Sequence, residues 1–341
     1  MEKKNGALAT MKDVAKAAGV STATVSRALM NPDKVSARTR QKVENSVLEV
    51  GYYPHSLAKN LRRNDARTIL VIVPNISDPF FTDVIRGIEE TAAEHGYLVL
   101  IGDCQHQQQQ EHAFINFLIT KRIDGMVLLG SNIPFDVSKE EQKNLPPIVM
   151  ANEFAPELEL PTVHIDNLTA AFNATHYLQK LGHKHIACIT GPETMPLCHY
   201  RLQGYIQALR RTGEEIREEY IIRGDFTHES GATLTETLLT LPAPPSAIFC
   251  HSDVMAMGAM WQAKKMGLKL PEDLSVVGFD NLNLAQYCEP ALTTVKQPRY
   301  EIGHHAILLL LEQLQGRLVA KGSRLLETEL IIRASTCSPK S

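Results

Sequence analysis

From residue 67 onward, the sequence alternates short apolar segments with segments of helical periodicity, and this alternation constrains the fold more than any other feature. Thr68 to Val73 is an apolar run, apolar residues then recur at helical spacing from Phe81 to Ala92, and Tyr97 to Ile101 is apolar again. Strands that alternate with helices form βαβ units and therefore parallel sheets. Three glycines stand between a helical segment and the next strand, where glycine commonly ends a helix: Gly96, Gly182 and Gly267.

This α/β body spans about 270 residues, which is more than one open sheet usually holds, so we expect two sheets and a cleft. In parallel sheets, ligands bind beyond the carboxyl ends of the strands. Many of the residues that follow the predicted strands in this chain are polar or aromatic. The candidate ligand-binding residues are Phe80, Phe81, Asn152, Arg201, Phe226, Ser252 and Asp280.

These side chains suit a ligand that has hydroxyl groups and a flat ring. Asp280 can accept two hydrogen bonds from a vicinal diol, Arg201 can donate to ring or hydroxyl oxygens, and a phenylalanine can stack on a base. A diol joined to an aromatic ring describes a nucleoside. Purely structural roles remain an alternative, with the phenylalanines in the core and Arg201 paired with a carboxylate.

The first sixty residues predict a separate bundle of three short helices. Apolar residues from Met11 to Ala18 recur at the spacing of one helix face, and Gly19 ends that helix. Ser21 is a good N-cap for a second helix over about Thr22 to Leu29. A third helix runs from a Ser36 cap to Gly51. Two short helices joined by a glycine turn form a helix-turn-helix.

The outward face of the second helix is the face that enters the DNA major groove in helix-turn-helix proteins. Arg27 can pair with guanine O6 and N7, and Thr22 and Ala23 can offer methyl contacts to thymine. Polar residues around the start of the third helix can bind phosphates. A generic helical hairpin is the alternative. The predicted DNA-contacting residues of this unit are Ser21, Thr22, Ala23, Thr24, Ser26, Arg27, Lys34, Ser36 and Thr39.

The charge distribution agrees with a nucleic-acid-binding unit at the N-terminus. Residues 1–65 carry 12 lysines and arginines against 6 acidic residues, although the whole chain has a net charge of −3. The rest of the chain is therefore acidic. A basic head favours contact with phosphates, since cations release the counterions condensed on DNA. A solvated basic face is the alternative.

Two further features of the composition indicate a cytoplasmic protein. The six cysteines include no C-x-x-C pair, which is typical of reduced thiols and not of a disulfide framework or a zinc ribbon. The N-terminal residues lack the apolar stretch of a signal peptide, and no segment has the apolar length of a membrane helix.

The segment between the bundle and the body has the pattern of a short amphipathic helix. Leu57 and Leu61 lie four residues apart, and Arg62 and Arg63 follow. A helix of this length is unstable alone in water, so we expect it to form only against a partner surface. A flexible linker with a chance pair of leucines is the alternative.

Three stretches together resemble the DNA-binding segment of the lactose-repressor (LacI) family: Met11–Met30, Val35–Ser36 and Gly51–Pro54. The resemblance extends over the whole chain. It implies an all-α helix-turn-helix headpiece, a hinge and linker, and an α/β body of the two-lobed periplasmic-binding-protein type (type I). The implied boundaries are 1–54 for the headpiece, 55–65 for the hinge and 66–337 for the body, with lobes at about 66–165 with 299–326 and about 166–296 with 327–337.

The resemblance also implies a mechanism. It describes a homodimeric repressor on operator DNA that is regulated by a small-molecule effector, with a hinge helix that inserts Leu61 between base steps and has Ala58 on the same face. Residues 26–36 are most similar to the branch of the family that responds to cytidine. That similarity implies cytidine as the inducer, control of genes for nucleoside uptake and catabolism, and cooperation with the cyclic-AMP receptor protein. Met30 and Asn152 depart from the common family pattern, in which asparagine and a carboxylate respectively are frequent.

Enzyme motifs that could be tested on an α/β body are missing from the sequence. It has no G-x-x-x-x-G-K loop, no G-x-G-x-x-G turn and no G-x-S-x-G elbow. The pairs His183/His185 and His304/His305 lack metal-binding helical spacing. We therefore expect no catalysis, no cofactor and no metal. A solute-binding receptor of a transport system and a nucleoside-processing enzyme remain as alternatives.

Overall fold

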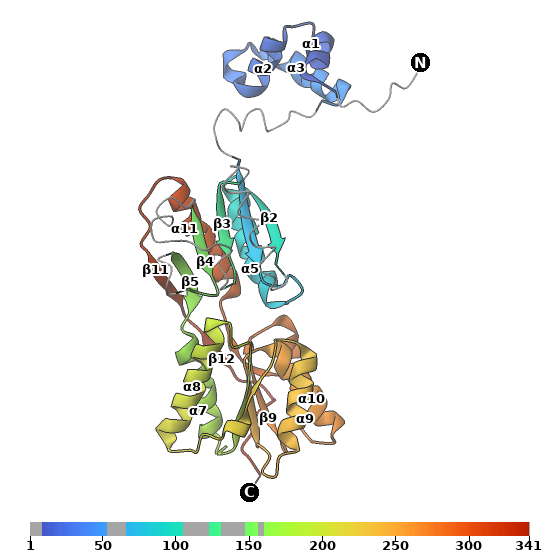
Figure 1. The fold of residues 1–341 in the computed structure, drawn as a ribbon. Coiled ribbons are helices and arrows are strands. Elements are labelled where there is room, and N and C mark those ends of the chain that lie inside the picture. The colour runs from blue at the N-terminus through green and yellow to red at the C-terminus, as the bar shows by residue number, and fades with distance from the viewer. Residues whose placement is uncertain (1–8, 53–65, 105–122, 131–146, 156–159, 341) are drawn as a thin grey trace. The chain divides into compact units, whose positions relative to one another are not determined.

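A computed structural model describes residues 9–52, 66–104, 123–130, 147–155 and 160–340, and the structural statements below concern these residues. The chain divides into two compact units, Met1–Ala66 and Arg67–Ser341, which are described separately (Figure 1). None of the described helices is long and apolar enough to span a membrane.

The first unit, here called the headpiece, is a bundle of short helices. Its elements are α1 (Met11–Ala18), α2 (Thr22–Met30), the 3₁₀ turn η1 (Pro32–Lys34) and α3 (Ala37–Val50). Ser21 and Ser36 cap α2 and α3, since each side chain accepts the backbone N–H three residues on. Gly19 ends α1 with a φ of 61°, a left-handed conformation that glycine adopts without steric cost. The core centres on Val14, Val25 and Val43, which are fully buried.

The second unit contains two six-stranded sheets. The first has the strand order β11-β5-β4-β3-β1-β2 and is parallel throughout, and the second has the order β12-β10-β9-β8-β6-β7, with only β12 antiparallel. The first sheet is formed by β1 (Thr68–Val73), β2 (Leu98–Asp103), β3 (Gly125–Leu128), β4 (Ile148–Ala151), β5 (Pro161–Ile165) and β11 (Gly322–Leu326). The second is formed by β6 (Ile186–Thr190), β7 (Ile221–Arg223), β8 (Ala247–Cys250), β9 (Ser275–Asp280), β10 (Thr293–Lys296) and β12 (Glu329–Ile331).

Each sheet and its helices form one lobe. In the N-lobe, the first sheet packs against α5 (Phe80–Glu94) and α11 (Arg299–Leu314). In the C-lobe, one face of the second sheet is covered by α7 (Asn167–Lys180) and α8 (Pro196–Thr212) (Figure 1). The other face is covered by α9 (His228–Leu239) and α10 (Asp253–Lys265), and two 3₁₀ turns, η3 (Glu218–Tyr220) and η4 (Asn283–Tyr287), complete the lobe. This confirms the predicted fold class of an all-α headpiece and a two-lobed α/β body.

The chain passes between the lobes three times: after β5, after β10, and between β11 and β12. The return of β11 places residues from near the C-terminus at the edge of the N-lobe sheet. Because three connections join the lobes, residues that are distant in sequence meet at their boundary.

Helices α5 and α11 of the N-lobe touch backbone to backbone. A Cβ atom at Gly87 would lie 2.2 Å from the carbonyl oxygen of Tyr300, and a Cβ at Gly303 would lie 2.1 Å from the carbonyl oxygen of Val84. Only glycine permits this approach. The close contact fixes the start of α5, which carries Phe80 and Phe81, against the rest of the lobe.

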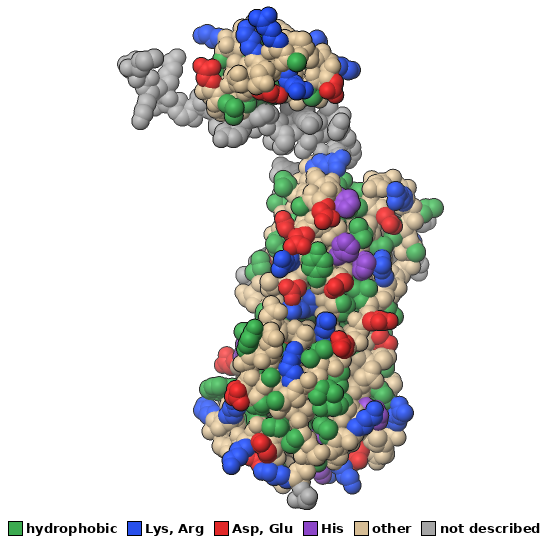
Figure 2. All heavy atoms as spheres, turned by 180° about the vertical axis from the view of Figure 1, so that it is seen from behind, with side chains coloured by type: hydrophobic (Ala, Val, Ile, Leu, Met, Phe, Trp, Pro, Cys, Tyr) green, Lys and Arg blue, Asp and Glu red, His purple; other side chains and the backbone are tan. Residues whose placement is uncertain are grey.

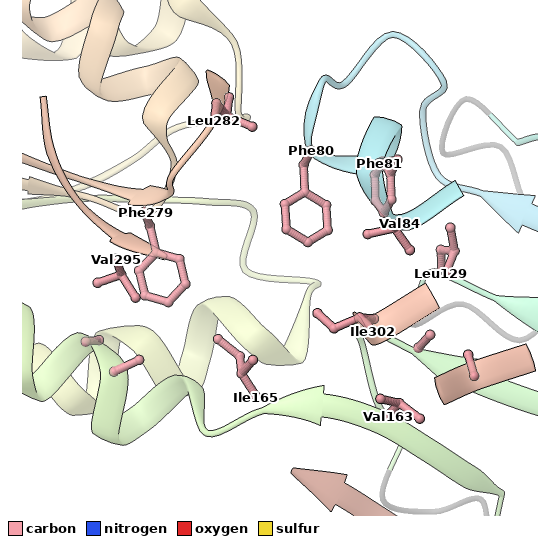
Figure 3. Close-up of a cluster of buried hydrophobic side chains, with 14 of the residues drawn as sticks. Phe80, Phe81, Val84, Leu129, Val163, Ile165, Phe279, Leu282, Val295 and Ile302 are labelled. Carbon is pink, nitrogen blue, oxygen red and sulfur yellow. The ribbon is translucent and has the colours of Figure 1, made fainter. Parts of the chain in front are cut away.

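The buried apolar side chains continue across the lobe boundary. Phe80 and Phe81 of α5 belong to the same buried cluster as Phe279 of β9 and Val295 of β10. Figure 3 shows Phe80 extending into the space between the lobes, while Phe81 lies beside Val84. Helix α5 begins at Phe80, whose N–H donates to the Asp78 carboxylate at 2.9 Å.

Candidate functional site

A cavity of about 270 Å³ lies between the two lobes. N-lobe residues after β1 and β4 form one wall, and C-lobe residues after β6, β7, β8 and β9 form the other. The cavity is lined by every residue that the strand-end pattern predicted as ligand-binding: Phe80, Phe81, Asn152, Arg201, Phe226, Ser252 and Asp280. The fold thus gathers residues that are up to two hundred positions apart in the sequence.

Arg201 of α8 is held rigidly in the wall of this cavity. Its Nε donates to the side-chain oxygen of Asn167 at 2.8 Å, and its Nη1 donates to the carbonyl oxygen of His251 at 2.6 Å. The guanidinium carbon lies 3.7 Å from the centroid of the Phe279 ring, a cation–π contact. Among the described residues Arg201 forms no ion pair, so the predicted alternative of a carboxylate partner was wrong. These contacts leave further N–H donors for a ligand.

Asp280 is the last residue of β9, whereas the sequence placed it just after the strand. Its Oδ1 accepts a hydrogen bond from Gln297 Nε2 at 2.7 Å. Burial raises the pKa of Asp280 well above its ordinary value, and the nearby Arg201 opposes that rise. The carboxyl is therefore fixed in position and shielded from water, as a group that reads ligand hydroxyls must be.

Three of the cavity residues have an unusual backbone conformation. Asn152, Phe226 and Asp280 have φ angles of 68°, 67° and 115°, which side chains other than glycine rarely adopt. Such conformations cost of order 1–3 kcal/mol each and cluster at functional sites. Phe226 also requires a glycine opposite, because a Cβ at Gly191 would lie 2.2 Å from its ring.

The other predicted cavity residues have structural contacts as well. Phe80 and Phe81 are buried, and their rings meet edge to face at 5.1 Å. The Ser252 oxygen caps α10 by accepting the N–H of Met255, which leaves its own O–H available as a donor. Asp253 is not the cap of α10, because its carboxylate accepts from Thr294 and the backbone of Leu282.

Gln297 and His228 line the cavity but were missed from the sequence. Gln297 directly follows β10, so the strand-end rule that found Asp280 also applies to it. Its side-chain oxygen is buried and has no hydrogen-bond partner among the described residues. His228 is the first residue of α9 and carries no signal that distinguishes it from a helix-start residue.

In the headpiece, Thr22, Ala23 and Arg27 are exposed along α2, as predicted for a base-reading face. Ser26 is half-buried, with its hydroxyl directed to the sulfur of Met30 at 3.8 Å. Figure 2 shows lysine and arginine side chains at several places on the visible face of this unit.

Several of the other predicted DNA-contacting residues have contacts within the headpiece. Ser21 bonds to Thr24 at the start of α2, and Ser36 bonds to Thr39 at the start of α3. Lys34 is exposed at the end of η1. The two predicted hinge residues, Ala58 and Leu61, lie outside the described residues.

Comparison with known proteins gives matches over nearly the whole chain. A model described as "Bacterial regulatory proteins, lacI family" matches residues 10–55, and one described as "Periplasmic binding proteins and sugar binding domain of LacI family" matches residues 66–328. The chain is 68% identical to the "HTH-type transcriptional repressor CytR" of Escherichia coli (strain K12), over 98% of both proteins. It is 35% identical to the "Catabolite control protein A" of Priestia megaterium, over 96% of this chain and 99% of that protein.

A solved structure is similar along the full length. It is the lac repressor dimer bound to operator and the anti-inducer ONPF, with a TM-score of 0.84 and 26% identity, over 97% of this chain and all of that one.

Proposed function

This chain belongs to the LacI family of bacterial regulatory proteins, and on that premise we propose that cytidine, or a closely related nucleoside, is the effector that releases it from operator DNA. The chain is a DNA-binding transcriptional repressor under the control of a small-molecule effector. The observation that carries the proposal is an interlobe cavity whose lining brings Arg201 and Asp280 together with aromatic side chains. We expect its targets to be genes for nucleoside uptake and catabolism, and its location to be the cytoplasm.

The chemistry of the cavity supports a nucleoside through two sets of contacts. Arg201 and Asp280 supply a donor and a carboxyl group for the ribose hydroxyls. Phe80 and Phe226 offer ring faces on which a base can stack, and Asn152 and Gln297 offer amide groups that match the hydrogen-bonding edge of a base. In this account, a ligand that bridges both walls draws the lobes together.

Lobe closure is coupled to DNA through the segment at 55–65 in this proposal. That segment folds as a helix on DNA, with Ala58 and Leu61 in the minor groove. Closure of the lobes then disfavours the arrangement in which this helix forms. The coupling is reciprocal, so operator DNA weakens cytidine binding by the same factor. Cooperation with the cyclic-AMP receptor protein on DNA is part of the same proposal.

A thermal-shift screen of nucleosides and free bases tests the effector. A ligand that binds the folded state stabilises it by about 2.7 kcal/mol at a concentration 100 times its Kd, which corresponds to a rise of several degrees in Tm. We expect cytidine to give such a rise and free sugars to give none. If cytidine leaves Tm unchanged while a sugar or a purine base raises it, the nucleoside assignment is wrong.

Exposed apolar side chains support the proposal of a homodimer. β2 is an edge strand of the N-lobe sheet, and Leu98 and Leu100 on it are 71% and 49% exposed. Trp261, Leu284 and Tyr287 of the C-lobe are 59%, 61% and 77% exposed. Apolar residues on an unpaired edge strand favour association, which a second copy of the chain satisfies.

The double substitution Leu98→Glu with Leu100→Glu is expected to convert the protein into a monomer, because carboxylates then line the edge strand. Sedimentation velocity measures the change, and operator affinity is expected to fall with it, since paired headpieces no longer bind together. Leu318→Glu, at a fully exposed leucine after α11, is the matched control and should remain dimeric. A double variant that still sediments as a dimer would exclude β2 from the interface.

The two alternative functions have less support. A headpiece that matches residues 10–55 and a structural likeness to an operator-bound dimer disfavour a solute-binding receptor. For the enzyme alternative, we propose that the cavity binds its nucleoside without converting it. Incubation of cytidine with the protein should therefore return cytidine alone.

A further inference from the structure

A buried carboxyl group joins the two lobes beside the cavity. Glu153 follows Asn152 in the N-lobe loop after β4, and its side chain is fully buried. Its Oε1 accepts the backbone N–H of Leu197 at 3.0 Å. Leu197 is the second residue of α8, so this hydrogen bond runs from the N-lobe to a C-lobe helix. The other oxygen, Oε2, is buried without a hydrogen-bond partner among the described residues.

The helix that Glu153 holds is the one that carries Arg201. Leu197 and Arg201 are four residues apart on α8, so they lie on the same face of the helix, one turn from each other. Both residues line the cavity. A hydrogen bond that fixes the first turn of α8 against the N-lobe therefore also fixes the distance between Arg201 and the opposite wall.

The surroundings of Glu153 make this contact sensitive to its protonation. Burial raises the pKa of Glu153 to about 8, against the opposing effects of the Leu197 N–H, the Arg201 guanidinium and the Phe154 N–H. The Cys198 thiol of α8 also faces it, and burial raises the pKa of that thiol to about 12, so it stays neutral. His164 of β5 lies beyond Phe154, on which its ring stacks at 4.8 Å.

The cost of burying the Glu153 side chain differs between its two protonation states. Below its pKa, the carboxyl is neutral, and its burial costs less than that of the anion. Above its pKa, it is a buried anion whose Oε2 has no donor among the described residues, and its nearby donors and Arg201 offset only part of the cost of removing the charge from water. Hydration relieves that cost, and separation of the lobes at α8 would expose this buried group to water.

We propose that Glu153 is a proton-controlled latch between the lobes, which holds α8 and Arg201 in the binding geometry when neutral and releases them when ionised. Glu153 is a positioning residue in this proposal, since it acts on the ligand through Arg201. The proposal rests on the interlobe cavity being the effector site.

Cytidine binding by the full-length chain, measured by titration calorimetry at about pH 6.5 and about pH 9, tests the latch. If only the neutral form binds, the apparent Kd rises in inverse proportion to the neutral fraction, which is roughly 10-fold between these pH values for a group with a pKa of about 8. E153Q keeps a neutral acceptor for the Leu197 N–H, so its affinity should change by less than about 2-fold. E153L should bind weakly at both pH values. E219Q, at an exposed glutamate, is the control and should follow the unsubstituted protein.

Other ionisable residues, Asp280 and His228, line the same cavity, so the latch is tested by the difference in pH dependence between the unsubstituted protein and E153Q. Equal pH profiles for these two proteins would overturn the latch.

A second measurement tests the latch without a ligand. Hydrogen exchange at about pH 6.5 should show the Leu197 amide protected in the unsubstituted protein and in E153Q, and exchanging at least about 10-fold faster in E153L. Equal exchange in all three proteins would overturn the latch, even if cytidine proves not to bind. Absence of cytidine binding together with the predicted exchange pattern would count only against the nucleoside proposal.

Discussion

Replacing Arg201 with leucine is expected to leave operator binding nearly intact while making it insensitive to cytidine. Arg201 is the fixed cation in the cavity wall, and hydrogen bonds from a charged donor contribute about 1.5–3 kcal/mol each. The loss of one such bond to the ligand lowers cytidine affinity by about 10- to 150-fold, and the loss of two lowers it by up to about 10⁴-fold. The headpiece does not contain this residue, so its DNA-reading face is unchanged.

The substitution also has a cost in stability. Leucine leaves the Asn167 side-chain oxygen and the His251 carbonyl without their donor, which costs about 1–3 kcal/mol for each buried group. Arg201→Lys, which keeps the charge, is the companion variant and should be less destabilised while still losing most of the cytidine response. Operator titrations with and without cytidine, beside thermal melts, measure both effects. An Arg201→Leu protein that is folded and released by cytidine as readily as the unsubstituted one would contradict the assigned role.

Replacing Arg27 with alanine is expected to lower affinity for the operator by about 10- to 100-fold, with a much smaller loss on unrelated DNA. Arg27 is exposed on α2 beside Thr22 and Ala23, where it can donate two hydrogen bonds to one guanine. A lost base contact costs about 1–3 kcal/mol and relaxes specificity at one position of the site.

Arg38→Ala provides the matched control for the Arg27 variant. Arg38 is exposed at the start of α3, and we expect it to contact phosphate. Its loss should weaken binding to every DNA sequence equally. It should also reduce the slope of log K against log salt concentration by about one. If Arg27→Ala also weakens operator and unrelated DNA by the same factor, Arg27 is a phosphate contact and not a base contact.

Most of the architecture could be predicted because local rules decide it. The apolar run at Thr68–Val73 and the helical spacing that follows are typical of a βαβ unit wherever they occur, and serine caps such as Ser21 mark helix starts. The cavity residues Arg201 and Asp280 could be predicted too, because ligands bind at the carboxyl ends of parallel strands. In each case a few neighbouring residues carry the signal.

Features that depend on the meeting of the two lobes could not be predicted in this way. Glu153 follows Asn152 in sequence and has no pattern of its own, and its role depends on the first turn of α8, about forty residues later. The pairing of β11 with β5 joins residues about 160 positions apart. The sequence of β11 is largely exposed and does not alternate between apolar and polar residues as a strand commonly does. Gln297 follows a strand, but its contact with Asp280 arises only when β9 and β10 pair.

We propose that occupancy of the interlobe cavity controls the DNA-binding headpiece, and an operator titration of the unsubstituted dimer with and without saturating cytidine tests this coupling most directly. A two-state coupling of 1–3 kcal/mol predicts that cytidine weakens operator binding by about 5- to 150-fold while leaving binding to unrelated DNA little changed. An operator Kd that stays the same in saturating cytidine, with binding of cytidine verified in the same sample, would contradict the account.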